Sequence, residues 1–450
     1  MQVTEANADG LKRTIKVVVG AGELGQRYES RLGEIKDSVQ LKGFRKGKVP
    51  VTHLKKVYGR SVMAEVLQEA VTETSRQVIT DRNERPAFQP KIELAEEPGA
   101  IDRVIAGAGD LAYTMSFEIL PKVALTDLSA IHLTRPVAEV TDEAIDKAIA
   151  TLVERGKTFE PKDDHVAAEG DRLTVDFVGR IDGEAFEGGT AEGVNVVLGQ
   201  STFIPGFEDG LKGAKAGEER LVKASFPADY GAKHLAGKDA VFEAKVKEVA
   251  VARKPEVDDA FAKTMGADSL SDLRTKVADQ IKKEYGQVSR GKLKRALLDA
   301  LDKAHTFELP PTLVDNEFEG IWGQVTQSLK QAGKTLEDEG KSEDDAKAEY
   351  RKIAERRVRL GLVLAEIGES NTITVNDEEL QRGIFAQARR YPGQERMVVD
   401  YYTKSPEALA ELRAPIFEDK VVDFAIELVK VADKTVSRDE LLKEDEDPEI

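Results

Sequence analysis

The feature that most constrains this fold is a change of hydrophobic period along the chain. Between residues 156 and 248 apolar residues alternate with polar ones, as they do in strands, whereas from residue 253 onward they recur at helical spacing. The alternating segment also holds seven of the 16 phenylalanines in about a fifth of the chain. Because 450 residues are too many for one ordinary hydrophobic core, the sequence predicts roughly two to four domains.

The N-terminal part combines strand and helix patterns. The predicted elements are a half-buried strand at 11–19, an amphipathic helix at 22–41, a short helix at 51–59, a long helix at 61–83 and a second strand at 110–120. The second strand could pair with the first, which would complete an α+β domain that ends near residue 113.

Charge is distributed unevenly over the chain. Residues 1–60 contain 13 Lys or Arg and six Asp or Glu, which gives this segment a net charge of +7. Because the whole chain has a net charge of −17, residues 61–450 must have a net charge of −24. No acid lies between Asp37 and Glu65. The basic residues in this window are Lys42, Arg45, Lys46, Lys48, Lys55, Lys56 and Arg60. We therefore expect one end of the molecule to present a cationic patch that attracts a polyanion such as RNA.

The segment 41–50, LKGFRKGKVP, lies inside this basic window and between two predicted helices. Gly43 and Gly47 permit tight backbone turns, and Pro50 begins the next helix. The segment is therefore predicted to form the tip of a helix hairpin. Taken alone, a segment of this kind is most often only a polar turn.

Residues 114–155 form a predicted connecting region that contains Pro121 and Pro136. Its one predicted helix covers 141–156, with Thr141 as the N-cap. No residue pattern in this region indicates a chemical site.

The aromatic-rich segment is predicted to be mostly β. Its strands are expected at 171–182, 194–199, 218–226 and 240–249, with a tight turn at Asp182-Gly183 and a short helix within 204–213. From the pattern alone, the phenylalanines could form either an ordinary hydrophobic core or a concave aromatic pocket for an apolar ligand.

Three motifs in this segment resemble those of FKBP-type peptidyl-prolyl isomerases. They are VDFVGRIDGEAFEGG at 175–189, VVLGQSTFIPGFEDGLKGAKAGE at 196–218 and FPADYG at 226–231. The sequence departs from better-known members of that family, which have tryptophan where this chain has Phe207 and aspartate where it has Glu187. The segment after Tyr230 is also shorter than theirs. The resemblance implies a pocket wall composed of Phe177, Phe186, Val194, Phe203, Ile204, Phe207, Tyr230, Leu235 and Phe242.

The chemistry that this resemblance implies needs no nucleophile, metal or cofactor. Rotation about an X-Pro bond has a barrier of about 18–20 kcal/mol because amide resonance is lost in the twisted state. An aromatic slot that excludes water would favour the twisted amide, since it removes hydrogen bonds that stabilise the planar, charge-separated form. The resemblance further implies that the Tyr230 hydroxyl and the Ile204 backbone N–H hold substrate carbonyls, and that Glu187 orients these contacts.

From residue 253 onward the chain is predicted to be helical and highly charged. Helices are expected at 269–304, 309–333, 344–370, 376–391 and 407–433, with Asn376 and Glu379 as an N-cap pair. Most of their apolar stripes would pack helix on helix. About 200 helical residues without a catalytic cluster also suit an open surface that holds other chains. The acidic tail, residues 438–450, is predicted to be disordered.

Other chemistries find little support in the sequence. The chain contains no cysteine, which excludes disulfides and thiolate sites, and its five histidines match no metal-ligand spacing. GAGELG at 20–25 matches GxGxxG, but no βαβ unit accompanies it. No cofactor is therefore predicted. The N-terminus resembles no secretory leader and no run of about 18 apolar residues occurs, so we expect neither secretion nor membrane spanning.

The order of these parts resembles the trigger factor family, bacterial ribosome-associated chaperones, over essentially the whole chain. The segment GFRKGKVP matches that family's ribosome-binding loop, GFRxGxxP. The residues that carry over are Gly43, Phe44, Arg45, Lys46, Gly47 and Pro50. The resemblance implies docking on the large ribosomal subunit near the exit tunnel, on ribosomal protein and rRNA, and ATP-independent holding of unfolded nascent chains. It also implies a cytoplasmic location, a monomer-dimer equilibrium off the ribosome, and roles in protein export and cell division.

The sequence thus predicts a multidomain α+β protein. The expected parts are a ribosome-binding domain at 1–113, a linker at 114–155, an FKBP-type isomerase domain at 156–248, an all-α substrate-binding domain at 249–437 and an acidic tail at 438–450. Two hypotheses of different class follow. The first is a ribosome-docked chaperone with an auxiliary isomerase, and the second is a free cytosolic proline isomerase whose helical region is only a scaffold. The concentration of positive charge at one end favours the first.

Overall fold

The computed structural model describes residues 1–39, 44, 48–94, 100–106, 108–228 and 230–443. The chain divides into two compact units, each of which is discontinuous in sequence. The first unit contains Met1–Pro136 and Arg290–Lys434, and the second contains Val137–Ser289 and Thr435–Lys443. Within the described ranges, no helix has both the length and the apolar composition needed to cross a bilayer.

The N-terminal part of the first unit is built on a four-stranded antiparallel sheet with the order β1-β2-β4-β3. The predicted pairing of the first and last strands is confirmed, since Ile15 of β2 lies opposite Met115 of β4 and both side chains are buried. The boundary expected near residue 113 falls inside β4. The edge strands were not predicted, because the side chains of β1 are all exposed and β3 is short. The strands are β1 (Gln2–Asp9), β2 (Lys12–Val19), β3 (Lys91–Leu94) and β4 (Leu111–Glu118).

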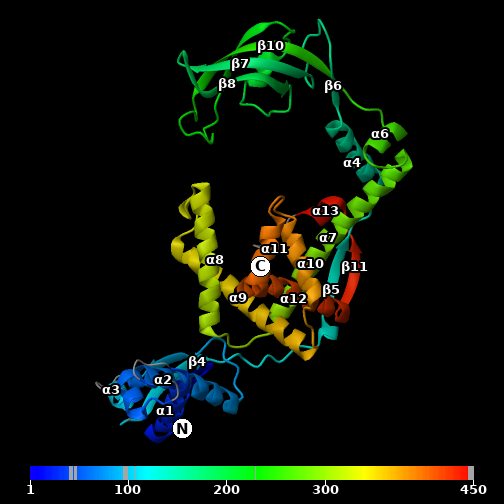
Figure 1. Cartoon of the computed structure of the whole chain (residues 1–450). Coiled ribbons are helices and arrows are strands. Elements are labelled where there is room, and N and C mark those ends of the chain that lie inside the picture. Colours follow the sequence, from blue (N-terminus) through cyan, green and yellow to red (C-terminus); the bar gives the residue numbers. More distant parts are fainter. Residues whose placement is uncertain (40–43, 45–47, 95–99, 107, 229, 444–450) are drawn as a thin grey trace. The chain divides into compact units, whose positions relative to one another are not determined.

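Helices α1 (Ala21–Ser38) and α2 (Val51–Arg82) form the predicted hairpin and lie side by side (Figure 1). The prediction of two helices at 51–59 and 61–83 was wrong, because α2 runs unbroken through both. Gly59 is a packing position rather than a helix break: a Cβ there would lie 2.8 Å from the Tyr28 hydroxyl. The short helix α3 (Ala100–Ile105) completes this part of the unit.

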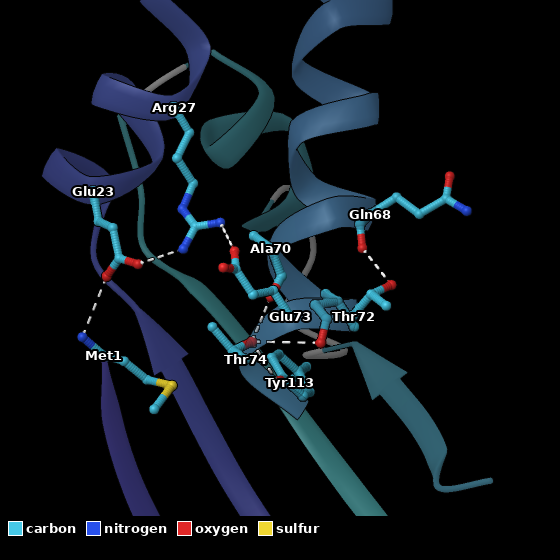
Figure 2. Close-up of polar contacts among 10 residues, drawn as sticks. Met1, Glu23, Arg27, Gln68, Ala70, Thr72, Glu73, Thr74 and Tyr113 are labelled. Carbon is cyan, nitrogen blue, oxygen red and sulfur yellow. Dashed lines mark hydrogen bonds and ion pairs between the residues drawn. The ribbon is translucent and has the colours of Figure 1, made fainter. Parts of the chain in front are cut away.

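A row of ion pairs joins these elements (Figure 2). Figure 2 shows the Arg27 guanidinium of α1 between two carboxylates, those of Glu23 on its own helix and Glu73 on α2. Glu23 also accepts a bond from the amino group of Met1 at 3.3 Å, and the Arg27 guanidinium is the main cause of its lowered pKa. Deeper in the core, the Tyr113 hydroxyl lies 2.8 Å from that of Thr74, so this buried hydroxyl has a partner.

The rest of the first unit is a helical body. Its core is formed by residues such as Leu297, Val363 and Val421, all with no exposed surface. Ion pairs between neighbouring helices surround that core; Arg359 contacts Asp302 at 2.6 Å, for example. The elements are the second half of α7 (Leu270–Ala304), η1 (Leu128–Ala130), α8 (Pro311–Ala332), η2 (Glu337–Glu339), α9 (Glu343–Ser370), α10 (Asp377–Ala388), α11 (Glu395–Lys404) and α12 (Pro406–Leu428).

Two short strands complete the helical body and lie far apart in the sequence. Strand β5 (His132–Val137) forms a two-stranded sheet with β11 (Lys430–Thr435). The Arg135 guanidinium donates to both carboxylate oxygens of Asp433, at 2.7 and 2.9 Å, across 298 positions of sequence. The region predicted to be all-α, 249–437, therefore includes β11.

The second unit contains the aromatic-rich domain. Its five-stranded sheet has the order β6-β10-β7-β8, and β9 pairs with the other end of β10. The predicted turn at Asp182-Gly183 is present, with both residues at positive φ (52° and 87°), as a two-residue hairpin requires. Strand β8 is longer than predicted. The elements are β6 (Thr158–Pro161), β7 (Arg172–Ile181), β8 (Glu184–Val197), α5 (Phe207–Leu211), β9 (Glu219–Ser225) and β10 (Asp239–Arg253).

A small helical cluster accompanies this sheet in the second unit. Helix α4 (Asp142–Arg155) begins at the predicted cap, where Thr141 accepts the Ala144 N–H at 3.3 Å. It packs through Ile149 against α6 (Asp259–Thr264) and the first half of α7.

The tail also differs from its prediction. Residues 438–442 form helix α13 (Arg438–Leu442), because Ser437 caps its first turn and Leu441 is fully buried. The remaining residues of the predicted tail, 444–450, lie outside the described residues.

Candidate functional site

A cavity of about 1060 Å³ lies on the aromatic-rich sheet, between α5 and the loops that follow β8 and β9. Its walls combine aromatic rings with a few polar groups. The lining residues include Phe177, Phe186, Glu187, Phe203, Ile204, Phe207, Glu208, Phe226, Tyr230, His234, Leu235 and Phe242. A concave apolar site with few polar groups is the usual form of a small-ligand site.

The rings of this cavity are packed mainly edge to face. Phe207 is the centre of the group: its ring centroid lies 5.3 Å from that of Phe177, 5.1 Å from Phe242 and 5.2 Å from Phe203. A second group extends the wall, with Phe226 at 4.8 Å from Tyr230. Such contacts add about 0.5–1.5 kcal/mol per pair to the burial of the rings. The wall is therefore shaped before any ligand arrives.

Backbone geometry places Phe207 at the base of the cavity. Gly206, just before α5, has φ of +92°, and a Cβ there would lie 2.8 Å from the Lys223 carbonyl oxygen. Only glycine fits this position without strain. The following residue, Phe207, is only 1% exposed. The buried Phe207 ring therefore fills the space beneath the slot.

Nine of the ten residues expected at the pocket line the cavity. The exception is Val194, which lies in β8 opposite Val175 and packs on the sheet core instead. The prediction missed Phe226 and Glu208, although both lie inside the quoted motifs. Their contribution was not evident, because it depends on a turn and on backbone partners.

Two hydrogen-bond donors at the cavity could hold the carbonyls of a bound peptide. The Ile204 N–H has no hydrogen-bond acceptor within the described part of the chain, and the same holds for the Tyr230 hydroxyl. Tyr230 is 38% exposed, so its hydroxyl is accessible at the rim. The Glu187 side chain is also exposed there. These groups surround an apolar slot, which is the arrangement that desolvation of a prolyl amide requires.

One lysine at the rim of the cavity pairs with two acidic side chains. The Lys212 ammonium lies 2.9 Å from Asp209 and 3.7 Å from Glu169. The bond to Asp209 is the first cause of the raised pKa of Lys212. The lining still contains more acidic than basic residues, because Glu187 and Glu208 lie there as well.

The second candidate site is the basic loop between α1 and α2. Of its six expected residues, Phe44 and Pro50 are described, whereas Gly43, Arg45, Lys46 and Gly47 lie outside the described residues. The Phe44 ring is 36% exposed and its centroid lies 5.2 Å from the His53 ring. Pro50 is the N-cap of α2.

The base of this loop is anchored. The side chain next to Pro50, Val49, is buried with Leu32 and Leu54 in a cluster beneath the hairpin tip. Lys55 forms an ion pair with Glu29, and hydrogen bonding to that carboxylate is the main cause of its raised pKa. The residues that follow the loop are thus held in place by apolar packing and by an ion pair.

A third surface combines exposed apolar side chains. Four large residues of α10, α11 and the turn between them are more than half exposed: Phe385 (55%), Tyr391 (55%), Met397 (62%) and Tyr401 (58%). Among the described residues, only Val57 and Leu221 are other large apolar side chains exposed to that degree. We call these four residues the α10–α11 apolar surface. A concentration of this kind is typical of interaction sites.

Comparison with family profiles divides the chain into three matches. A profile described as "Bacterial trigger factor protein (TF)" matches residues 1–152, and "Bacterial trigger factor protein (TF) C-terminus" matches residues 269–427. Between them, "FKBP-type peptidyl-prolyl cis-trans isomerase" matches residues 164–247, the segment that carries the aromatic cavity.

Full-length relatives match over nearly the whole chain. "Trigger factor" of Parvibaculum lavamentivorans is 54% identical over 98% of this chain and 86% of its own length. "Trigger factor" of Azorhizobium caulinodans is 51% identical over 99% of both chains. A solved structure described as the "Trigger Factor Chaperone" matches with a TM-score of 0.56 over 95% of this chain and 99% of its own, at 21% identity, which supports the fold.

Proposed function

The chain belongs to the trigger factor family, as a chaperone with an FKBP-type peptidyl-prolyl isomerase domain, and we propose that it docks at the exit site of the ribosome through the 43–50 loop. There it holds nascent and newly made chains without ATP and isomerises their X-Pro bonds. The observation that carries the proposal is the combination in one chain of an aromatic slot, a basic hairpin tip and an exposed apolar surface.

The isomerisation follows from the chemistry of the cavity. We assign the prolyl ring to the slot between Phe177, Phe207 and Phe242, where it is removed from water. The carbonyl before the proline loses hydrogen-bonded water as it enters, and the planar form of the amide loses the stabilisation that this water gave. The Ile204 N–H and the Tyr230 hydroxyl would hold neighbouring carbonyls of the peptide, so that the prolyl amide stays in the slot. Binding the twisted state more strongly than the planar state lowers the barrier.

Docking on the ribosome is assigned to the loop at the tip of the α1–α2 hairpin. Arg45 and Lys46 would meet rRNA phosphates or acidic side chains, and Phe44 would enter an apolar niche on ribosomal protein. The exposure of Phe44 above a buried base supports this assignment. The net charge of +7 in residues 1–60 supports it as well, because the remaining chain, at −24, would be repelled by RNA. The proposed setting is the cytoplasm, with a monomer-dimer equilibrium off the ribosome.

Unfolded chains are assigned to the α10–α11 apolar surface. Each of its four side chains leaves more than half of its area in water, so a client that covers them gains hydrophobic free energy without displacing any part of the fold. Exposed side chains can also accommodate many client sequences, because no fixed wall selects a shape.

Ribosome co-sedimentation over a salt series tests the docking proposal. The variant Phe44→Ala, Arg45→Ala, Lys46→Ala should lose binding, and wild-type binding should weaken steeply with salt, since phosphate contacts release counterions. The matched control removes the same residue types elsewhere in the N-terminal part, as Arg76→Ala, Phe88→Ala, Lys91→Ala. Docking lies elsewhere if the loop variant still co-sediments like wild type.

A further inference from the structure

The buried carboxylate of Glu208 lies at the aromatic cavity and is 8% exposed. Its partners are backbone N–H groups of the loop between β8 and α5. Oε2 accepts from Gly199 at 2.9 Å and Ser201 at 3.1 Å, and Oε1 accepts from Thr202 at 2.8 Å and Phe203 at 3.4 Å. A buried charge is tolerable only when such bonds replace its hydration, so carboxylate and loop stabilise each other.

The Glu208 carboxylate thus accepts hydrogen bonds from four of the five backbone N–H groups between residues 199 and 203. The remaining amide of the segment, that of Gln200, donates to the Val197 carbonyl at 3.4 Å. The next amide along the chain is that of Ile204, which has no acceptor among the described residues. Its own carbonyl accepts the Phe207 N–H at 3.1 Å, which fixes the peptide plane that follows it. The first uncommitted donor of the loop is therefore at the cavity wall.

We propose that Glu208 is a positioning residue for proline isomerisation: it fixes the 199–203 loop so that the Ile204 N–H stays free and directed at the substrate carbonyl. The inference rests on the proposed role of Ile204 in the slot. In this role Glu208 contacts the loop amides rather than the amide bond that rotates. It acts by holding the four loop amides that donate to its carboxylate. Without it, these amides would reorient toward water, and the Ile204 amide that follows them would move.

The substitution Glu208→Gln tests this role with little change of volume. Glutamine has one acceptor oxygen where glutamate has two, and its NH₂ group would face backbone donors, so the loop must shift. We expect isomerisation of a proline-containing peptide by the full chain to fall about 10-fold or more, because a misplaced Ile204 contact binds the transition state less strongly. NMR exchange measures this rate. The fall should lie mainly in the catalysed rate, with peptide affinity changed less. The control Glu219→Gln, at an exposed acid on β9, should keep wild-type rates.

Amide hydrogen exchange separates positioning from simple stability. In the wild-type chain, the amides of Gly199 and 201–203 should exchange slowly, and that of Ile204 should become protected only when the peptide binds. Glu208→Gln should lose this peptide-dependent protection. This wild-type measurement decides the matter even if the variant fails to fold.

Two results would overturn the inference: an Ile204 amide that does not respond to the peptide, or a folded Glu208→Gln chain with activity within twofold of wild type. Failure of the proposed pocket is a different outcome. In that case Phe207→Ala, which removes the slot itself, would also leave isomerisation unchanged.

Discussion

The aromatic cavity and the α10–α11 apolar surface offer similar side chains in opposite states. In the cavity, Phe207 and Phe242 are at most 5% exposed and contact one another, whereas Phe385 and Tyr401 of the surface are each more than half exposed. Fixed rings select one geometry, that of a prolyl amide, while exposed side chains accept many sequences. The difference teaches that one chain can combine a shape-selective site with a permissive one, by packing the first and leaving the second uncovered.

The largest expected effect comes from breaking the packed site. Phe207→Ala should destabilise the aromatic-rich domain by about 3–5 kcal/mol, because it deletes a fully buried ring and leaves a cavity. Proline isomerisation should be lost with it. Denaturant unfolding followed by circular dichroism measures the first effect, and NMR exchange of a prolyl peptide measures the second. A stability within 1 kcal/mol of wild type would contradict the central position of this ring.

The permissive site should fail differently, with binding lost and stability retained. Replacing the four residues of the α10–α11 apolar surface by serine should weaken binding of an unfolded client by at least about 10-fold, since their apolar area is no longer available. Fluorescence titration with a labelled client measures the affinity. A matched control replaces four other exposed apolar residues, Val3, Leu94, Leu221 and Val241, and should bind like wild type. Equal losses in both variants would mean that exposure alone, rather than this surface, holds clients.

The two sites should also be separable in one molecule. Deleting residues 156–248 should abolish isomerisation while most of the protection of an unfolded client from aggregation is retained, because the α10–α11 apolar surface belongs to the other compact unit. Light scattering of a denatured client gives the readout. Complete loss of protection would instead favour a free isomerase with a helical scaffold.

A smaller effect should follow from removing one polar atom at the slot. Tyr230→Phe should lower isomerisation roughly 2-fold to 10-fold, the usual value of one hydrogen bond. Stability should change little, because the side chain is 38% exposed. Comparing rate constants with the unfolding midpoint separates the two contributions. An unchanged isomerisation rate would show that the Tyr230 hydroxyl does not bind the substrate.

The smallest effect should be a pH dependence at the start of α10. Glu379 completes a capping box with Asn376, and its ion pair with Lys420 is the first cause of a pKa lowered from 4.5. A lowered pKa in the folded state stabilises the fold above pH 4.5, and this contribution is lost as the pH falls through the folded value. Unfolding of Glu379→Gln, measured from pH 6 to pH 3, should therefore depend less on pH than that of wild type. If the free energy of unfolding changed equally with pH in both proteins, Glu379 would not be the source of this pH dependence.

Much of the fold follows from local pattern, and the exceptions have physical causes. The Asp182-Gly183 turn and the Asn376 cap were predicted because each depends on neighbouring residues alone. Gly59 was taken as a helix break because the sequence does not reveal that Tyr28 packs against it. The exposed strand β1 has no apolar alternation, so its pairing with β2 could not be anticipated.

The candidate site divides in the same way. Nine of the ten predicted residues line the cavity, and seven of these nine lie in the motifs that resemble FKBP-type isomerases. Val194 lies opposite Val175 and packs against the same core as the wall residues, but the cavity does not extend to it. The role proposed for Glu208 could not be predicted, because its partners are backbone amides, which leave no pattern in the sequence. The roles in protein export and cell division stay predictions.

The pairing of β5 with β11 has a consequence for how this protein is itself made. The helical body is completed by a strand at 132–137 and another at 430–435, so the first strand leaves the ribosome long before its partner exists. Contacts of such long range also form slowly, because a large loop must close. During its own synthesis this chaperone therefore passes through a stage in which most of its residues have been made and its body is still open on one side.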